Sequence, residues 1–230
     1  MCKLIMSDKY PQFCDELTKA GQRITACDRI DAFAEPEQKH ADMQVLRIKD
    51  KIFILNECAD LKNKLSDKSL IFCKHNVKKN YPENILLNCL FINNKLFSKL
   101  DSTDENVLKY CKNNNIEAVS VNQGYTRCST LAVNDKAAIT SDKSIEKALK
   151  SNGVEVLLIS AGSIVLEGYN YGFIGGASVV IEDTVYFFGN IKAHPDFERI
   201  KEFCLNHNSK IEILCENMPL TDIGGAVKTE

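Results

Sequence analysis

The sequence predicts a single-domain α/β ring over residues 1–230, built from five β-β-α-β units with one unit split across the termini. An apolar hairpin pattern recurs four times at a nearly constant interval, and the two chain ends supply the parts of a fifth copy. A chain of 230 residues, 44% of them hydrophobic, is long enough to bury one sizeable core.

Each predicted hairpin is an apolar run, a two-residue polar turn and a second apolar run. The copies are MQVLRI-KD-KIFIL, LNCLFI-NN-KLFSK, TLAV-ND-KAAIT and SVVI-ED-TVYFF, with turns that begin at Lys49, Asn93, Asn134 and Glu182. The intervals between these turns are 44, 41 and 48 residues. Short polar loops between β-prone runs indicate hairpins, and a fixed period indicates a repeat architecture.

An amphipathic helix and a short apolar strand follow each hairpin. We expect the helices at CADLKNKL, TDENVLKYCKNN, DKSIEKALKSN and PDFERIKEFCLNH, where the last three begin at Thr103 or Asp104, at Asp142, and at Pro195 with Asp196. We expect the strands at SLIFC, IEAVSV, VEVLLIS and KIEILC.

The chain ends complete the pattern. Near the N-terminus, YPQFCDELTKAG indicates a helix and QRITAC a strand, with no hairpin before them, whereas DIGGAVKTE at the C-terminus indicates the opening of a hairpin with no helix after it. Joining the two gives a fifth unit and closes a ring, which removes the exposed sheet edges of an open array.

Composition narrows the class of protein. The net charge of -2 with interspersed charges argues against nucleic-acid binding, and the sequence has neither a signal-peptide pattern nor a membrane-spanning run, so we expect a cytoplasmic protein. The ten cysteines lack paired spacings, so we expect reduced thiols and no metal site. Cys58, Cys111 and Cys204 are expected as small core residues on inner helix faces.

In such a ring the first strands of the units converge on the central axis, so the residues that open them should line one pocket. These residues are His40 to Asp42, Leu87 to Cys89, Arg127 to Ser129, Gly175 to Gly176, and Gly224 to Gly225 in the split unit. The sequence therefore predicts polar groups around a central pocket.

The motifs HADM, QGYTRCST, GYNYGFIGGAS and DIGG, together with the five units, resemble the pentein superfamily of guanidino-group-modifying enzymes, and more closely an uncharacterised bacterial family assigned to that fold. That superfamily includes arginine deiminase, dimethylarginine hydrolase, amidinotransferase and agmatine deiminase. The resemblance implies a five-bladed α/β propeller with pseudo-fivefold symmetry, no cofactor, and a small guanidino or amidine cation as the ligand. The oligomeric state does not follow from it.

His40 and Asp42 are similar to the His-x-Asp of arginine deiminases. The resemblance implies that His40 is a general acid/base and that Asp42 binds the guanidinium group, and a histidine that titrates near neutral pH suits that role. The alternative is an exposed pair on a charged loop, because the polar segment EPEQKH precedes the motif.

The nucleophile departs from the family pattern. The enzymes place a catalytic cysteine shortly after a Gly-rich stretch near the C-terminus, but no cysteine follows Cys215 here, and Lys228 stands near that place. Either the pocket binds without covalent catalysis, as a binding protein, or Cys128 supplies the thiol. Arg127 beside Cys128 should lower the pKa of the Cys128 thiol. Cys89 has apolar neighbours, which would raise the pKa of its thiol, so Cys89 is the less suitable nucleophile. The alternative for Cys128 is a purely structural cysteine.

Further side chains are expected around the ligand. The predicted ligand-binding residues are Asn88, Asn122, Arg127, Ser129, Gly175, Gly176 and Asp222. Residues after the third strands should meet the pocket rim, and they are Asn122, Gln123, Ser160, Ser163, Glu216 and Asn217. GFIGGAS lacks the spacing of a dinucleotide fingerprint, so its glycines are expected to allow close backbone packing. His194 is expected to be a capping or surface residue.

Overall fold

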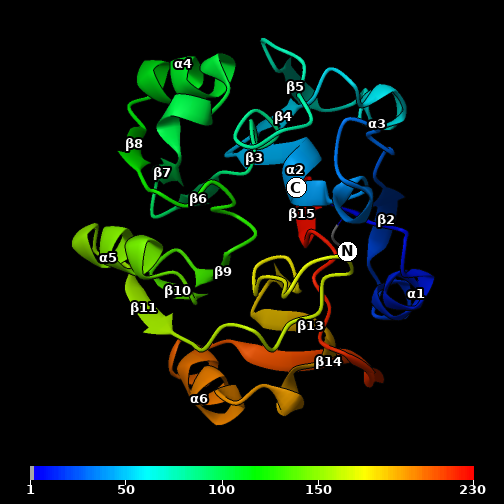
Figure 1. Cartoon of the computed structure of the whole chain (residues 1–230), viewed down its shortest axis with the longest axis vertical. Coiled ribbons are helices and arrows are strands. Elements are labelled where there is room, and N and C mark those ends of the chain that lie inside the picture. The colour runs from blue at the N-terminus through cyan, green and yellow to red at the C-terminus, as the bar shows by residue number, and fades with distance from the viewer. Residues whose placement is uncertain (1–2) are drawn as a thin grey trace.

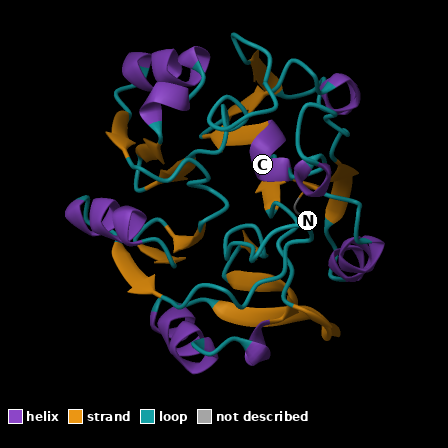
Figure 2. Cartoon of the chain, in the orientation of Figure 1, coloured by secondary structure: helices purple, strands orange, loops and turns teal. Residues whose placement is uncertain are grey.

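The computed structural model describes residues 3–230, which form five separate three-stranded sheets with helices beside them (Figures 1 and 2). The strands of this part of the chain are β1 (Lys3–Met6), β2 (Arg23–Ala26), β3 (Val45–Ile48), β4 (Lys51–Ile54), β5 (Ser69–Phe72), β6 (Leu90–Ile92), β7 (Lys95–Ser98), β8 (Glu117–Ser120), β9 (Thr130–Asn134), β10 (Ala137–Thr140), β11 (Glu155–Leu158), β12 (Ser178–Ile181), β13 (Thr184–Asn190), β14 (Lys210–Pro219) and β15 (Ala226–Lys228). The α-helices are α1 (Pro11–Lys19), α2 (Ala41–Gln44), α3 (Ala59–Lys64), α4 (Glu105–Asn113), α5 (Lys143–Ser151) and α6 (Phe197–Asn206).

Every sheet has the same internal topology. The middle strand pairs antiparallel with the first strand of its hairpin and parallel with the strand that follows the helix, as β4 pairs with β3 and β5. The sheets β6-β7-β8, β9-β10-β11 and β12-β13-β14 repeat this pattern. In the fifth sheet β1 pairs antiparallel with β15 and parallel with β2. The predicted β-β-α-β units and the pairing of the two chain ends are thus confirmed.

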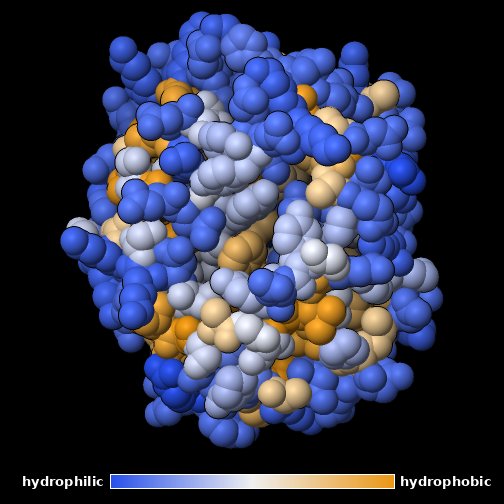
Figure 3. Space-filling model, in the orientation of Figure 1, coloured by the Kyte–Doolittle hydropathy of each residue, from blue (hydrophilic) through white to orange (hydrophobic). Residues whose placement is uncertain are grey.

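The five sheets lie around a common centre, with the first strand of each unit innermost and the helices α1, α3, α4, α5 and α6 at the periphery (Figure 1). Among the inner strands, β15 contacts β3 and β12, and β9 contacts β6 and β12. These strands do not join into one closed sheet. Figure 3 shows hydrophilic residues over the periphery of this face, with paler and apolar residues around its centre.

The core lies between the sheets and their helices. Cys58, Cys111 and Cys204 are buried among apolar side chains, as predicted, with Cys58 just before α3. Asp104 and Asp142 occupy the N-caps of α4 and α5, and each carboxylate accepts backbone N–H bonds from the first turn. None of the described helices is long and apolar enough to span a membrane.

Three of the four predicted hairpin turns are confirmed. Lys49, Asn93 and Glu182 begin them with φ values of 56°, 52° and 54°, the left-handed conformation that two-residue hairpin loops require even without glycine. The third turn was predicted one residue too early. Asn134 remains in β9 and pairs with Ala137, because its side-chain oxygen accepts the N–H of Lys136 at 2.8 Å and closes the turn itself.

Candidate active site

His40 and Asp42 lie on a single helical turn rather than at the start of a strand. The predicted apolar strand from Met43 begins instead at Val45, because residues 41–44 form α2 with His40 at its N-cap. The Asp42 N–H donates to the Gly224 carbonyl at 3.2 Å, which ties this turn to the C-terminal segment. His40 is 4% exposed and Asp42 1% exposed, so the alternative of an exposed pair is wrong.

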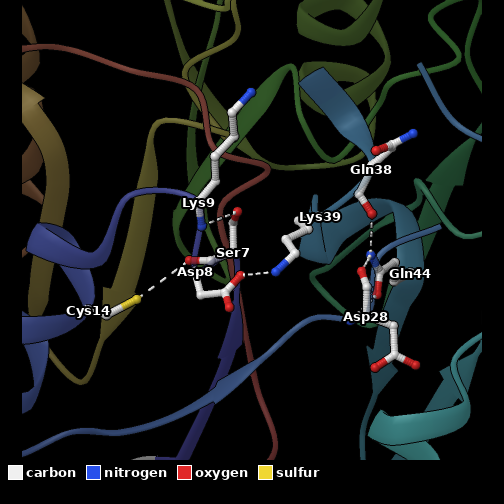
Figure 4. Close-up of polar contacts among 8 residues, drawn as sticks. All are labelled: Ser7, Asp8, Lys9, Cys14, Asp28, Gln38, Lys39 and Gln44. Carbon is white, nitrogen blue, oxygen red and sulfur yellow. Dashed lines mark hydrogen bonds and ion pairs between the residues drawn. The ribbon is translucent and has the colours of Figure 1, made fainter. Parts of the chain in front are cut away.

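The buried amide of Gln44 fixes α2 from its other end. Its Nε2 donates to the carbonyls of Asp28 and Gln38, and its Oε1 accepts the Asp28 N–H (Figure 4). The ion pair of Lys39 with Asp8 holds the preceding loop against the N-terminal segment (Figure 4). Contacts on both sides therefore set the direction of the His40 and Asp42 side chains.

Cys128 meets these two residues from the loop before β9. Its thiol donates to Asp42 Oδ2 at 2.7 Å, and one side-chain atom each of His40, Asp42 and Cys128 lies within 4.8 Å of the others. The three residues predicted as catalytic thus share one site. Such a set of imidazole, carboxylate and thiol atoms could hold a thiophilic metal ion.

Asn88, which is fully buried, organises the Cys128 loop. Its Oδ1 accepts the N–H groups of Arg127 at 2.8 Å and Cys128 at 3.2 Å. Its Nδ2 donates to Cys128 Sγ at 3.2 Å and contacts the Asp42 carbonyl at 3.4 Å. Asn88 therefore positions the thiol through four contacts within the protein, and none of these contacts depends on a bound ligand.

Two members of the cluster, His40 and Cys128, line a cavity of about 260 Å³, whereas Asp42 contacts Cys128 without lining the cavity itself. Acidic and aromatic side chains make up most of its wall, and the lining comprises Glu37, His40, Met43, Tyr125, Cys128, Leu166, Tyr169, Asn170, Tyr171, Phe173 and Asp222. Asp222 accepts the N–H groups of Phe173 and Gly224, each at 2.9 Å. Glu37 accepts a hydrogen bond from the Tyr169 hydroxyl at 2.8 Å.

Burial has the largest effect on protonation here, and it outweighs the charge of Arg127, which lowers the pKa of both Asp42 and Asp222. Desolvation, with the Asp222 charge nearby, raises the pKa of Asp42 to about 8, and desolvation raises the pKa of Asp222 to about 6. Burial also raises the pKa of Glu37. Desolvation lowers the pKa of His40 to about 3, with a contribution from Lys9, so the imidazole is neutral at physiological pH.

The prediction that Arg127 lowers the Cys128 pKa is wrong. Burial, followed by the Asp42 and Asp222 charges, raises the pKa of this thiol well above its ordinary value. The Arg127 guanidinium turns away and donates to the carbonyls of Thr130 and Gly175. The free protein therefore holds a protonated thiol.

The remaining predicted ligand-binding residues divide into two groups. Gly175 and Gly176 allow close packing, because a Cβ at Gly176 would lie 1.9 Å from Asp222 Oδ1 and one at Gly175 would strike the backbone of the Cys128 loop. Arg127 lines a second cavity of about 590 Å³ between the inner strands. Seven further predicted residues line neither cavity, and they are Asn122, Gln123, Ser129, Ser160, Ser163 and, on β14, Glu216 and Asn217.

His194 is buried, so the expectation of a surface residue is wrong. Its Nδ1 accepts the Asp196 N–H at 3.1 Å, but Asp196 is itself the N-cap of α6 and no side chain caps the first turn, so the capping expectation is not met either. The carboxylate of Asp196 accepts the Ser160 N–H, which draws this loop inward.

The sequence reasoning missed the acidic and aromatic wall. Glu37 falls in EPEQKH, whose polarity indicates a solvated loop, and Tyr169, Tyr171 and Phe173 alternate within GYNYGF, which the prediction treated only as a glycine-rich turn. The alternation of aromatic residues beside a candidate site was the available signal.

Comparison with known families shows to which family the chain belongs. The model of the "Family of unknown function (DUF6873)" matches residues 4–227. The chain belongs to this family. Comparison with curated proteins finds no match.

Solved structures show which fold the DUF6873 chain shares. Agmatine deiminase from C. jejuni superimposes with a TM-score of 0.57 at 10% identity, covering 98% of this chain and 92% of the deiminase. DDAH from Pseudomonas aeruginosa, complexed with citrulline, gives a TM-score of 0.60 at 9% identity and covers 99% and 98%. Inosamine-phosphate amidinotransferase from Streptomyces griseus gives 0.58 at 12% identity and covers 94% and 78%. The predicted likeness to the pentein fold is confirmed.

Proposed function

We propose that this protein is an enzyme that cleaves or transfers a C–N bond of a small guanidino or amidine cation, with Cys128 as the nucleophile. The proposal includes a single-domain, five-bladed propeller of pseudo-fivefold symmetry and a cytoplasmic location. The observation that carries the proposal is the contact of the Cys128 thiol with Asp42, beside His40, where Cys128 and His40 line an acidic and aromatic cavity. The guanidino-modifying activities of the structural neighbours agree with this class of ligand.

A cationic ligand supplies a further counter-charge to the site. A positive group beside Asp42, Asp222 and Cys128 favours their anionic forms, so binding lowers the pKa values that burial raises. The thiol proton then passes to the Asp42 carboxylate along the existing hydrogen bond, and the site forms a thiolate only when the ligand is present.

The thiolate attacks the amidine carbon and forms an S–C bond. The C–N bond then breaks, and the leaving amine takes the proton held by Asp42. Water, or an amine acceptor in a transfer reaction, attacks the same carbon while neutral His40 accepts one proton from it, and the S–C bond then breaks. In hydrolysis the departing sulfur takes the proton of the new hydroxyl group and His40 releases its proton to solvent, whereas in transfer His40 returns its proton to the sulfur, so that the thiol is regenerated in both cases. The low pKa keeps His40 neutral before the second step, but it also makes the imidazole a weak base, contrary to the expectation of a histidine that titrates near neutral pH.

A binding protein without covalent chemistry is the second candidate. The lack of a cysteine after Cys215 and the raised pKa of the Cys128 thiol favour it. In that case Asp42 and Asp222 would bind the cation and the Cys128 thiol would only pack beneath it.

A matched pair of electrophiles tests the enzyme proposal. Chloroacetamidine is cationic and chloroacetamide is its neutral counterpart, so we expect chloroacetamidine to alkylate Cys128 at least about tenfold faster at pH 7.5, read by mass spectrometry. Cys215, which is only partly buried, serves as the internal reference and should show a smaller preference. Equal rates at Cys128 would contradict the proposal.

Turnover separates the two candidates. The Cys128→Ser variant should still bind a guanidino ligand in calorimetry, whereas release of amine from that ligand should be abolished. Binding by both proteins with no amine release by either would establish the binding-protein alternative.

A further inference from the structure

We infer that the ligand of this cavity is a cation that carries no carboxylate, such as an aminoalkylguanidine or alkylamidine, rather than an amino acid. The inference rests on the proposed function and narrows its substrate class. It derives from the charges that line the cavity and from the partners of the nearby basic residues.

The cavity offers nothing that would bind an anion through charge. Among the described residues, its lining contains no lysine or arginine, whereas it includes the carboxyl groups of Glu37 and Asp222, and Asp42 is hydrogen-bonded to the lining residue Cys128. A ligand carboxylate would lose its hydration and meet like charges at short range. That arrangement is unfavourable in a buried site.

The basic residues near the cavity are already engaged. Lys9, close enough to lower the His40 pKa, pairs with Glu35 at 3.4 Å and Glu167 at 3.2 Å. Lys39 pairs with Asp8 (Figure 4). A ligand carboxylate would have to displace a protein carboxylate from either lysine.

Arg127 is likewise directed elsewhere. Its guanidinium donates to the Thr130 and Gly175 carbonyls, and the side chain lines the second cavity between the inner strands. Its charge lowers the pKa of Asp42, but by less than burial raises it, and its donors are directed to backbone carbonyls rather than into the smaller cavity.

The wall suits an alkyl chain that ends in a cation. The rings of Tyr125 and Phe173 stack with centroids 6.4 Å apart, and Tyr171 meets Phe173 edge-on at 6.1 Å. Aromatic faces pack against methylene groups and attract cations. Buried Glu37, held by the Tyr169 hydroxyl, adds a carboxylate that a second positive group can reach.

Three ligands of nearly equal size test the inference by calorimetry on the full chain at pH 7.5. Agmatine is arginine without its carboxylate, and argininamide keeps the bulk of arginine but not its negative charge. We expect agmatine and argininamide to bind at least about tenfold more tightly than arginine, which corresponds to about 1.4 kcal/mol.

Charge reversal in the wall provides the positive control. Asn170 is exposed and lines the cavity, so Asn170→Arg should raise the affinity for arginine relative to agmatine at least about fivefold. Ser163→Arg places the same charge on the same loop outside the lining, and it should leave that ratio unchanged.

The outcomes are distinct. Equal affinity of the wild type for arginine and agmatine overturns this inference but leaves the proposed function intact. No binding of any of the three ligands, together with no preference of Cys128 for chloroacetamidine, overturns both. An equal effect of Asn170→Arg and Ser163→Arg on the affinity ratio also counts against the inference. It would mean that the preference for agmatine over arginine comes from long-range charge and not from the residues that line the cavity.

Discussion

The Cys128 thiol lies 2.7 Å from Asp42 Oδ2, although the two residues are 86 positions apart in the chain. Cys128 precedes β9 and Asp42 lies on α2 before β3, so two different units of the ring supply the pair. Asn88 comes from the unit between them and bonds to both. The site is therefore assembled from three β-β-α-β units, since no single unit contains its parts.

Replacing Asp42 should change how stability depends on pH. The folded pKa of Asp42, about 8, lies above its ordinary value of 3.8, so the folded state holds this proton more tightly than the unfolded state. Stability from this group is fully present below about pH 4 and is lost as the pH rises through 8. Asp42→Asn should remove that loss, and melting temperatures between pH 4 and 9 measure it.

Asp135→Asn provides the control, because Asp135 is an exposed turn residue. It should leave the wild-type pH profile unchanged. His40 acts in the opposite direction at low pH, since its lowered pKa costs stability as the pH falls from 6.5 toward 3 in both proteins. A profile of Asp42→Asn that is parallel to the wild type above pH 5 would contradict the assigned pKa.

Gly224→Ala should disturb the site through backbone strain and a direct clash with His40. Gly224 has a φ of +77°, and a Cβ there would lie 2.4 Å from His40 Cβ. Gly21 has a φ of +85° with nothing within 4 Å of a Cβ, so Gly21→Ala carries the strain alone. We expect about 1 kcal/mol of destabilisation for Gly21→Ala and at least about 2 kcal/mol more for Gly224→Ala in urea unfolding. Similar losses for the two variants would show that the His40 packing is easily rearranged.

The sequence predicts the repeated units and their arrangement, but it does not predict the protonation states or the cavity wall at the site. Hairpins, helices and the split unit depend on local periodicity and turn residues, so the period of the turns predicts them. The residues that open the first strands could be placed near the axis because the repeat requires it, and His40, Asp42 and Cys128 meet there.

Protonation and the cavity wall depend on packing that no local pattern encodes. Arg127 is adjacent to Cys128 in sequence, yet its side chain points to the opposite side of the loop. Glu37 lies in a polar segment but is buried under Tyr169, 132 positions away. Adjacency in sequence therefore misleads about charge, because the sign of a pKa shift follows burial and spatial neighbours.

Asn88→Ala should destabilise the Cys128 loop more than an ordinary surface change. It removes the acceptor of two buried N–H groups, of Arg127 and Cys128, and leaves both without that partner. We expect a loss of about 2–4 kcal/mol in the free energy of unfolding. Asn122→Ala, at an exposed position, should change it by no more than about 0.5 kcal/mol. A loss below about 1 kcal/mol for Asn88→Ala would mean that the loop is held by other contacts.

At chloroacetamidine concentrations too low to fill the cavity, the rate of Cys128 alkylation reports the free protein, so it should rise with pH through the Asp42 pKa of about 8. Below that pH the carboxyl group is protonated and cannot accept the thiol proton, whereas above it the anion can, and the bound cation supplies the counter-charge for the thiolate. Asp42→Asn leaves the thiol without this acceptor, so the inflection should disappear and the rate at pH 8.5 should fall at least about tenfold. Mass spectrometry of Cys128, with Cys215 as the internal reference for reagent and pH, measures both profiles. The same inflection in the wild type and in Asp42→Asn would assign it to the thiol itself and remove Asp42 from the proton-transfer step.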